Sequence, residues 1–174
     1  MVQVRELSSN EQLEQASALY KEVWNSNGNS INERLKKHLT YKGFKGLIIP
    51  CEQGSVKGFA YGYTSLAGQY YHDLLAEELN TVEYQRWLKD CFEFVELAVH
   101  PSYRSQGYAR LLATKLLESV ENKTVILTTQ LDNQPARSLY KSLGWKDIKE
   151  NFYPNRSEQA FVIIGKELLR NPDH

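Results

Sequence analysis

The chain has 174 residues, of which 41% are hydrophobic and 24% are charged, a balance typical of one globular domain with a sizeable core. Lysine plus arginine equals aspartate plus glutamate, at 21 each, so the basic excess of nucleic-acid-binding proteins is missing. No apolar run approaches the roughly 20 residues of a membrane-spanning helix. We therefore expect a single domain over residues 1–174, without a nucleic-acid or membrane partner.

The cysteine content and the N-terminus bear on the cellular setting. The two cysteines, Cys51 and Cys91, do not form a metal-type cluster, so we expect no metal site. Residues 1–5 lack the charged and apolar regions of a signal peptide. A reduced, cytoplasmic setting is the expectation.

In the first half of the chain, hydrophobic residues recur first at helical and then at strand spacing. Ser8 to Glu11 offer a helix cap, with Glu11 or Glu14 near the first turn, and Leu13, Ala16 and Leu19 follow at helical spacing. The expected elements are a strand from Val2 to Leu7, a helix ending near Trp24, a turn-rich loop from Asn25 to Ser30, a helix from Asn32 to Leu39, a hairpin of strands Gly46–Cys51 and Val56–Ser65, and, from Leu66 to Asp90, a loop with one or two short helices.

In the second half, strand-like and helical segments alternate. The expected order is a strand Phe92–Val99 ended by Pro101, a helix from Gly107 to about Val120, a strand Thr124–Thr129, a helix Gln134–Leu143 stopped by Gly144, and closing strands Trp145–Phe152 and Gln159–Lys166. This alternation predicts an α/β or α+β fold with one central sheet.

The segment between the Phe92–Val99 strand and the next helix suits an anion. A helix N-terminus exposes unpaired N–H groups and the positive end of the helix dipole, where a pyrophosphate can bind. Gly107 and Ala109 are small enough for close backbone approach, and Arg104 and Arg110 supply positive charge. Taken alone, the small residues are explained more simply by a strand-loop-helix connection, and the segment is neither a Walker loop nor a Rossmann fingerprint.

Two blocks together resemble the GNAT superfamily of acyl-CoA-dependent N-acetyltransferases. The segment from Arg104 to Ala109, Arg-Ser-Gln-Gly-Tyr-Ala, is similar to the family turn Arg/Gln-x-x-Gly-x-Gly/Ala. Downstream, Asn133-x-x-Ala-x-x-Leu-Tyr140-x-x-x-Gly-Trp145 has the complete family spacing. The resemblance implies a GNAT-like α/β (α+β) fold, with a mixed, mainly antiparallel central sheet of about seven strands, splayed in the middle and flanked by helices.

The resemblance also implies acetyl-CoA as the cofactor and direct transfer of its acetyl group to a primary amine, with no acyl-enzyme. Strand backbone groups would pair with the pantetheine amides, the Val99 N–H would polarise the thioester carbonyl, and backbone N–H groups of the turn would hold the pyrophosphate. Asn133 would bind the cofactor arm, and Tyr140 would protonate the departing thiolate. The implied cofactor-binding residues are Leu97, Ala98, Val99, Arg104, Ser105, Gln106, Gly107, Tyr108, Ala109, Arg110 and Asn133.

The amine must lose a proton before it attacks, so a base or a water chain is useful. Glu93 lies six residues before Val99, a spacing similar to the catalytic glutamate of histone-acetylating and aminoglycoside-acetylating relatives. Strand alternation places Glu96 on the other face, as the alternative base or an acceptor-binding group. A solvated or ion-paired carboxylate explains either residue without catalysis, and His72 and His100 are weaker candidates.

Aromatic residues before this strand are candidates for the acceptor site. Phe59, Tyr61 and Tyr63 alternate on one strand face, which either packs on a helix or forms a wall for the amine, with charge attraction from Asp73, Glu77 or Glu83. The acceptor-binding candidates are Tyr61, Tyr63, Tyr70, Tyr71 and Glu96. The expected acceptor is a small-molecule amine. The alternatives are a peptide or protein amine and a non-catalytic acyl-CoA-binding regulatory domain, and a homodimer is compatible with the resemblance.

Overall fold

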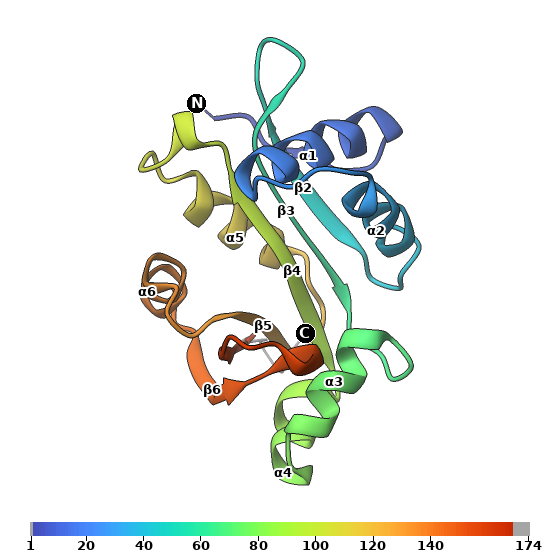
Figure 1. Cartoon of the computed structure of the whole chain (residues 1–174), viewed down its shortest axis with the longest axis vertical. Helices are drawn as coiled ribbons and strands as arrows, with labels where there is room; N and C mark the ends of the chain where they lie inside the picture. Colours follow the sequence, from blue (N-terminus) through green and yellow to red (C-terminus); the bar gives the residue numbers. More distant parts are fainter. Residues whose placement is uncertain (1, 169–174) are drawn as a thin grey trace, which may run out of the picture. The chain divides into compact units, whose positions relative to one another are not determined.

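The computed structural model describes residues 2–168 of the chain. Seven strands form one mixed, mostly antiparallel sheet in the order β1-β2-β3-β4-β5-β7-β6, flanked by six helices (Figure 1). The sequence-based prediction of about seven strands in one sheet is therefore confirmed. By their packing, the described residues divide into a first unit, residues 2–63 with 94–120, and a second unit, residues 64–93 with 121–168.

The first unit is built around the N-terminal hairpin and the helices that cover it. Its elements are β1 (Arg5–Glu6), α1 (Asn10–Val23), α2 (Ser30–His38), β2 (Lys45–Pro50), most of β3 (Val56–Thr64), the second part of β4 (Cys91–Val99), the 3₁₀ turn η2 (Pro101–Tyr103) and α5 (Tyr108–Glu118). Ser9 caps α1, because its hydroxyl accepts from the Gln12 N–H while the Gln12 side chain accepts from the Ser9 N–H. The expected glutamate partner in the first turn is thus replaced by Gln12.

The core of the first unit lies where α1 and α2 pack against β2 and β3 (Figure 1). Phe59 and Tyr61 of β3 are completely buried, and Tyr63 is 3% exposed. The residues that pack with them include Leu13, Ala16 and Leu19 of α1, Ile31 and Leu35 of α2, and Ile48 of β2. Each such burial of a large apolar side chain stabilises the fold by about 1.5–3 kcal/mol relative to exposure.

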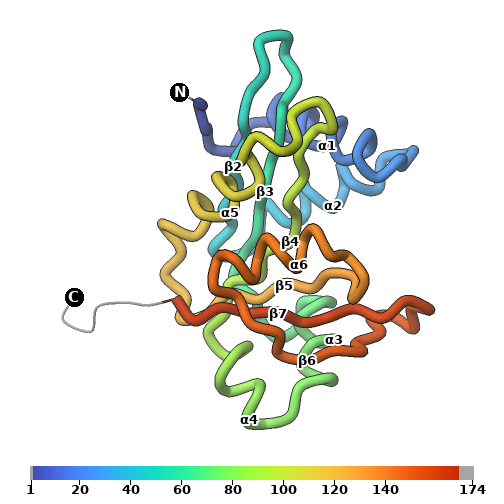
Figure 2. The backbone as a smooth tube through the Cα atoms, turned by 90° about the vertical axis from the view of Figure 1, so that its left-hand side faces the viewer, coloured from blue at the N-terminus to red at the C-terminus, as the bar shows by residue number. Residues whose placement is uncertain are grey.

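The second unit contains the C-terminal strands and the helices between β3 and β4. Its elements are α3 (Tyr70–Glu78), α4 (Thr81–Glu83), the π-helical turn η1 (Tyr84–Leu88), the start of β4, β5 (Thr124–Gln130), α6 (Gln134–Ser142), β6 (Lys146–Phe152), the 3₁₀ turn η3 (Pro154–Arg156) and β7 (Phe161–Glu167). Strand β7 lies between β5 and β6 and is antiparallel to both (Figure 2). At Gly165 of β7, an added Cβ would lie 2.6 Å from Ile148 Cδ1 and 3.0 Å from the Trp87 ring, so a side chain at this position would require its neighbours to shift.

Two expected strand boundaries are wrong in detail. The first strand pairs only Arg5 with Ile48 and Glu6 with Leu47, so it is far shorter than the predicted 2–7 segment. The last strand begins at Phe161 rather than Gln159. In the second unit, the expectation of a loop with one or two short helices from residue 66 to residue 90 is confirmed, because α4 continues directly into η1 and α3 is the other helix.

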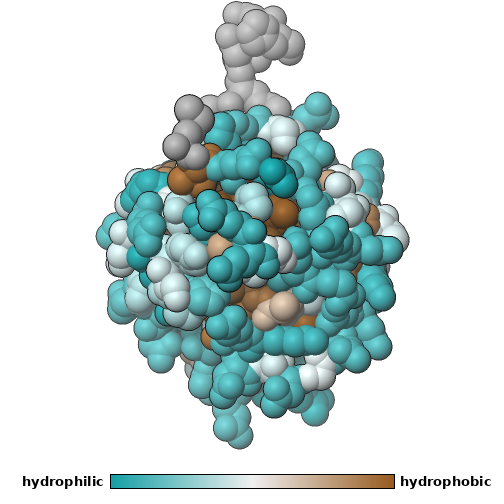
Figure 3. All heavy atoms as spheres, turned by 90° about the horizontal axis from the view of Figure 1, so that it is seen from above, coloured by the Kyte–Doolittle hydropathy of each residue, from teal (hydrophilic) through white to brown (hydrophobic). Residues whose placement is uncertain are grey.

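The surface features of the described residues are modest. The face drawn in Figure 3 is mostly hydrophilic, with small separate hydrophobic areas. Within residues 2–168, no helix has the length and apolar character that crossing a membrane requires. The same residues contain no group of three or more histidine, cysteine, aspartate or glutamate side chains arranged to hold a metal ion.

Candidate active site

The expected pyrophosphate turn forms an exposed loop that leads directly into α5. Ser105 and Gly107 both have left-handed backbone conformations, with φ values of 62° and 84°. Gly107 is the N-cap of α5 and provides no side-chain cap for the first helical turn. A Cβ added at Gly107 would meet nothing within 4 Å, so the space in front of the turn is open. The uncapped N–H groups and this open space fit a phosphate-bearing ligand.

Residues around the turn hold it in place and add positive charge. His100 precedes the turn, and its Nδ1 accepts from the Ser102 N–H at 3.0 Å while its Nε2 lies 3.0 Å from a Glu22 carboxylate oxygen. His100 therefore acts as a structural cap, the outcome that the sequence favoured for it. Lys57 places its Nζ 5.0 Å from the centre of the Tyr103 ring and 5.8 Å from that of Tyr108, which adds a cation at the turn that the sequence did not suggest.

Glu96, on the part of β4 that belongs to the first unit, forms an ion pair with a helix residue. Its Oε1 accepts from Nη2 of Arg34 on α2 at 3.2 Å, and the two side chains are 15% and 39% exposed. Burial raises the pKa of Glu96 to about 7, although the positive charge of Arg34 acts in the opposite direction. A carboxyl with this pKa exchanges its proton close to neutral pH, as a general base must.

Glu93, on the part of β4 that belongs to the second unit, is buried with 4% exposure. The Ser65 hydroxyl lies 3.5 Å from Glu93 Oε1 and 2.8 Å from Nδ1 of His72. The His72 Nε2 lies 3.0 Å from the Tyr84 hydroxyl, and burial lowers the pKa of His72. Glu93 thus belongs to a chain of polar side chains with Ser65, His72 and Tyr84, and His72, which the sequence offered as a weak base candidate, is a member of that chain.

Asn133 and Tyr140 lie at the two ends of α6 in the second unit. Asn133 is the N-cap, whose side-chain oxygen accepts from the Ala136 N–H at 3.2 Å and whose amide donates to the Thr129 hydroxyl at 3.3 Å. Tyr140 is 5% exposed, and its ring centre is 5.1 Å from that of Trp145. Both residues therefore have structural contacts in addition to the cofactor and acid roles expected for them.

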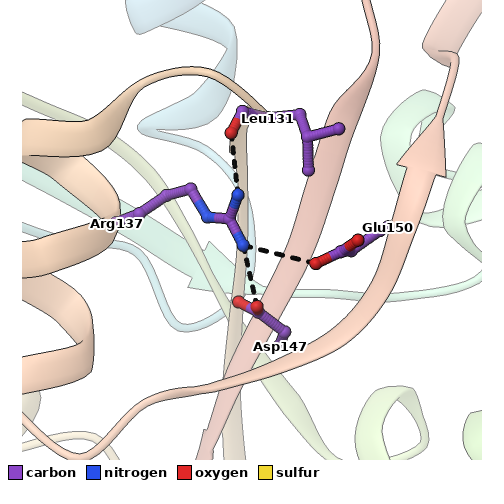
Figure 4. Close-up of polar contacts among 4 residues, drawn as sticks. All are labelled: Leu131, Arg137, Asp147 and Glu150. Atoms are coloured by element: carbon purple, nitrogen blue, oxygen red, sulfur yellow. Dashed lines mark hydrogen bonds and ion pairs between the residues drawn. The ribbon is translucent and has the colours of Figure 1, made fainter.

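Arg137 fixes α6 to the strand that follows it. Its guanidinium donates to the Leu131 carbonyl and to Asp147, both at 2.8 Å, and approaches Glu150 at 3.5 Å (Figure 4). A hollow of about 580 Å³ lies beside Arg137, but its lining includes neither Asn133 nor Tyr140. We therefore assign no catalytic role to this hollow.

The four aromatic candidates for the acceptor site have different surroundings. Tyr61 and Tyr63 lie in the core of the first unit, and the Tyr61 hydroxyl is 2.9 Å from Nδ1 of His38. In the second unit, Tyr70 is 62% exposed, whereas the Tyr71 hydroxyl is bonded to the Thr128 hydroxyl at 2.6 Å. Burial raises the pKa of Tyr71 to about 12, so this phenol stays neutral at physiological pH.

Two of the three acidic residues proposed to attract the acceptor, Asp73 and Glu83, have local partners. Asp73 accepts from the Gly68 N–H at 3.1 Å, and Glu83 caps its own helix through Asn80 and pairs with Lys149 at 3.5 Å. These contacts explain Asp73 and Glu83 as turn and cap residues.

Arg34 is the site residue that sequence reasoning missed. One signal pointed to its surroundings: positions 34–51 contain five lysine and arginine residues and no aspartate or glutamate. Because Arg34 and Glu96 are 62 positions apart, only the fold reveals that they pair.

Comparisons with known proteins agree with this geometry. A family model described as the acetyltransferase (GNAT) family matches residues 13–145. A GCN5-like protein acetyltransferase of Mycobacterium tuberculosis is 29% identical over 119 residues, 64% of this chain and 58% of that protein. The ribosomal protein bS18-alanine N-acetyltransferase of Escherichia coli is 34% identical over 73 residues, 39% of this chain and 49% of that protein. The chain thus spans about half the length of these curated relatives.

Solved structures share the fold over nearly the whole chain. The ribosomal-protein-S18-alanine N-acetyltransferase from Escherichia coli superposes with a TM-score of 0.71 at 16% identity, covering 100% of this chain and 99% of that chain. An aminoglycoside 6'-N-acetyltransferase complexed with coenzyme A gives a TM-score of 0.68 at 17% identity, with coverages of 98% and 99%. At these identities the likeness establishes the fold alone.

Proposed function

Because the chain belongs to the acetyltransferase (GNAT) family, we propose that it transfers the acetyl group of acetyl-CoA to the primary amine of a small molecule. The observation that carries the proposal is the geometry of the Glu96 carboxyl, which pairs with Arg34, lies in a side chain that is 15% exposed, and has a pKa that burial raises to about 7. A primary alkylamine is mostly protonated at this pH, so a base is needed before the nitrogen can attack.

The turn before α5 is proposed as the cofactor-binding element of the first unit. Backbone N–H groups from Gln106 to Ala109 would bind the pyrophosphate, and Arg104, Arg110 and Lys57 would add positive charge around it. Backbone groups of Leu97 to Val99 would hold the pantetheine arm, and the Val99 N–H would stabilise negative charge developing on the carbonyl oxygen. Bound acetyl-CoA supplies the thioester that is attacked.

Glu96 is the proposed base, and Glu93 is the alternative. In its ionised form Glu96 accepts a proton from the acceptor ammonium and leaves a neutral amine. Tyr140 is the proposed acid that protonates the departing thiolate, and Asn133 is a proposed contact of the cofactor arm. Glu93 is less suited to direct proton exchange with an acceptor because it is only 4% exposed.

Direct attack, rather than an acyl-enzyme, is the proposed route, and the residue that tests it is Cys51, a partly exposed thiol whose pKa is lowered by its hydrogen bond with Tyr103. Two other potential nucleophiles are inaccessible. Ser65 is 2% exposed and Cys91 is completely buried, and burial also raises the pKa of the Cys91 thiol. Under direct attack, the intact mass of the protein after incubation with acetyl-CoA alone should be unchanged. A stable acetyl adduct on the protein that a later amine removes would contradict direct attack.

A second candidate function is acetylation of a peptide or protein amine. It is favoured by the relatives described as a GCN5-like protein acetyltransferase and a bS18-alanine N-acetyltransferase. The test combines calorimetric titration with acetyl-CoA and CoA-release assays on panels of small amines and of peptides. We expect binding of acetyl-CoA and faster turnover of small amines. Faster turnover of peptides would favour the second candidate, binding without turnover would indicate a regulatory acyl-CoA-binding domain, and no binding would refute the proposal.

A further inference from the structure

The ion pair between α2 and β4 engages one nitrogen of the Arg34 guanidinium. Arg34 contacts Glu96 through one nitrogen, Nη2, at 3.2 Å, rather than through a two-pronged pair. The ring of Tyr20 lies 5.2 Å from Arg34 Cζ and fixes the guanidinium on one side. The Arg34 side chain is nevertheless 39% exposed. The Arg34 Nε is buried, and Tyr20 is a further hydrogen-bonding neighbour of the guanidinium, so a second anion would bind the exposed N–H donors that Glu96 and Tyr20 leave.

The arrangement of the two charges matches one class of amine. An α-amino acid carries its ammonium and its carboxylate on the same carbon, so the two opposite charges lie side by side, as they do in the Glu96–Arg34 pair. Placed head to tail against the pair, such a molecule brings its nitrogen to Glu96 and its carboxylate to Arg34. Both contacts are then charge-assisted hydrogen bonds. We infer that the acceptor is a free α-amino acid or a close analogue, and that Arg34 recognises its carboxylate.

This inference rests on the proposed function, because Glu96 is the proposed base. It goes further by naming the class of acceptor and the residue that selects it.

A peptide N-terminus fits this arrangement poorly, because the carboxyl group of its first residue is in a peptide bond and has no charge for Arg34.

The first experiment compares acceptors that differ only at the carboxyl group. Sets such as phenylalanine, phenylalaninamide and phenethylamine, and alanine, alaninamide and ethylamine, are assayed with acetyl-CoA by release of CoA. Since hydrogen bonds to charged groups are the strong class, we expect kcat/KM to be about 30-fold or more higher for the preferred amino acid than for its amide. The difference should lie mainly in KM. Equal turnover of the amino acid and its amide would overturn the inference.

The second experiment assigns the preference to Arg34. In Arg34→Gln the ratio of kcat/KM between amino acid and amide should fall to within about threefold, whereas Arg34→Lys should keep part of it, because lysine retains the charge without the planar fork. The matched control is Lys36→Gln, which removes an exposed positive charge from the same helix and should keep the wild-type ratio. Melting temperatures verify that each variant is folded.

The outcomes separate this inference from the proposed function. If Arg34→Gln retains the preference for the amino acid, Arg34 does not read the carboxylate and the inference fails. If only amines without a carboxylate are acetylated, the inference fails while the proposed function stands. If acetyl-CoA binds but no amine of any panel is acetylated, the proposed function fails and the inference falls with it.

Discussion

Replacing Glu96 by glutamine removes a carboxyl whose ionisation is opposed by its surroundings. The carboxylate is the form that accepts a proton, and burial raises the pKa of Glu96 to about 7. The wild-type kcat/KM should therefore fall about tenfold for each pH unit below 7, and Glu96→Gln should lack this acidic limb. Because a positioned base typically contributes about 10²–10⁴ in rate, the variant should be slower by that factor at pH 8.

The same replacement has a calculable effect on stability. The ordinary pKa of the Glu96 carboxyl is 4.5 and its folded value is about 7, so the folded protein holds this proton more tightly than the unfolded chain does. For a group whose pKa is higher in the folded protein, the free energy of unfolding decreases as the pH rises from the pKa of the unfolded chain to the pKa of the folded protein. At about 1.4 kcal/mol per pH unit, the loss is roughly 3 kcal/mol in the wild type. Glu96→Gln has no such titration.

Urea unfolding at pH 4 and at pH 8 measures this loss. Between these two pH values the free energy of unfolding of the wild type should fall by roughly 3 kcal/mol relative to that of Glu96→Gln. Glu33→Gln, which alters an exposed glutamate on α2, is the control and should show no such shift. Glu93→Gln, which removes the alternative base, serves as the comparison in the pH dependence of kcat/KM. An unchanged acidic limb in Glu96→Gln would refute the assignment of the base, and a pH-independent stability difference would refute the reasoning from burial.

Three further predictions concern the cofactor turn and α6. Gly107→Ala forces a side chain into a left-handed conformation with φ of 84°, at a cost of about 1–2 kcal/mol. This variant should bind acetyl-CoA up to about tenfold more weakly in calorimetry. The control Gly54→Ala, at φ of 80° in the β2–β3 turn, should lower the melting temperature but leave the affinity for acetyl-CoA unchanged. Tyr140→Phe should lower kcat by about 10² if the phenol is the acid, and undiminished turnover would remove it from the mechanism. Arg137→Gln should lower the free energy of unfolding in urea by about 1–2 kcal/mol, because the Leu131 carbonyl and Asp147 lose their donor; an unchanged midpoint would show that these contacts contribute nothing.

Much of the fold could be predicted because its signals are local. Leu112 and Leu116, spaced by one helical turn, are both buried in α5, and Gly144 has the positive φ expected of a residue that ends a helix. The block from Asn133 to Trp145 and the turn before α5 were sufficient to predict the family, which the family model confirms. The cap of α1 was located correctly, but the partner could not be chosen among several polar neighbours.

The rest of the site depends on contacts between distant positions. Composition and alternation leave Tyr61 equally suited to a core and to a binding wall, and only the packing of α1 and α2 against β3 places it in a core. In the same way, Glu93 and Glu96 have similar local patterns, yet Ser65 faces one and Arg34 faces the other. The roles of these carboxylates therefore depend on tertiary neighbours that lie 28 and 62 positions away.

Strand β4 contributes side chains to the hydrophobic clusters of both units, Cys91 to one and Ala98 to the other. Exchange of the β4 amide hydrogens with solvent therefore requires disruption of one cluster near Cys91 and of the other cluster near Ala98. Hydrogen exchange should therefore be slowest in β4, where the free energy of opening derived from the exchange rates should approach the free energy of global unfolding. The strand that carries both candidate bases would then also be the most persistent element of the chain, which keeps their backbone positions fixed through many catalytic cycles.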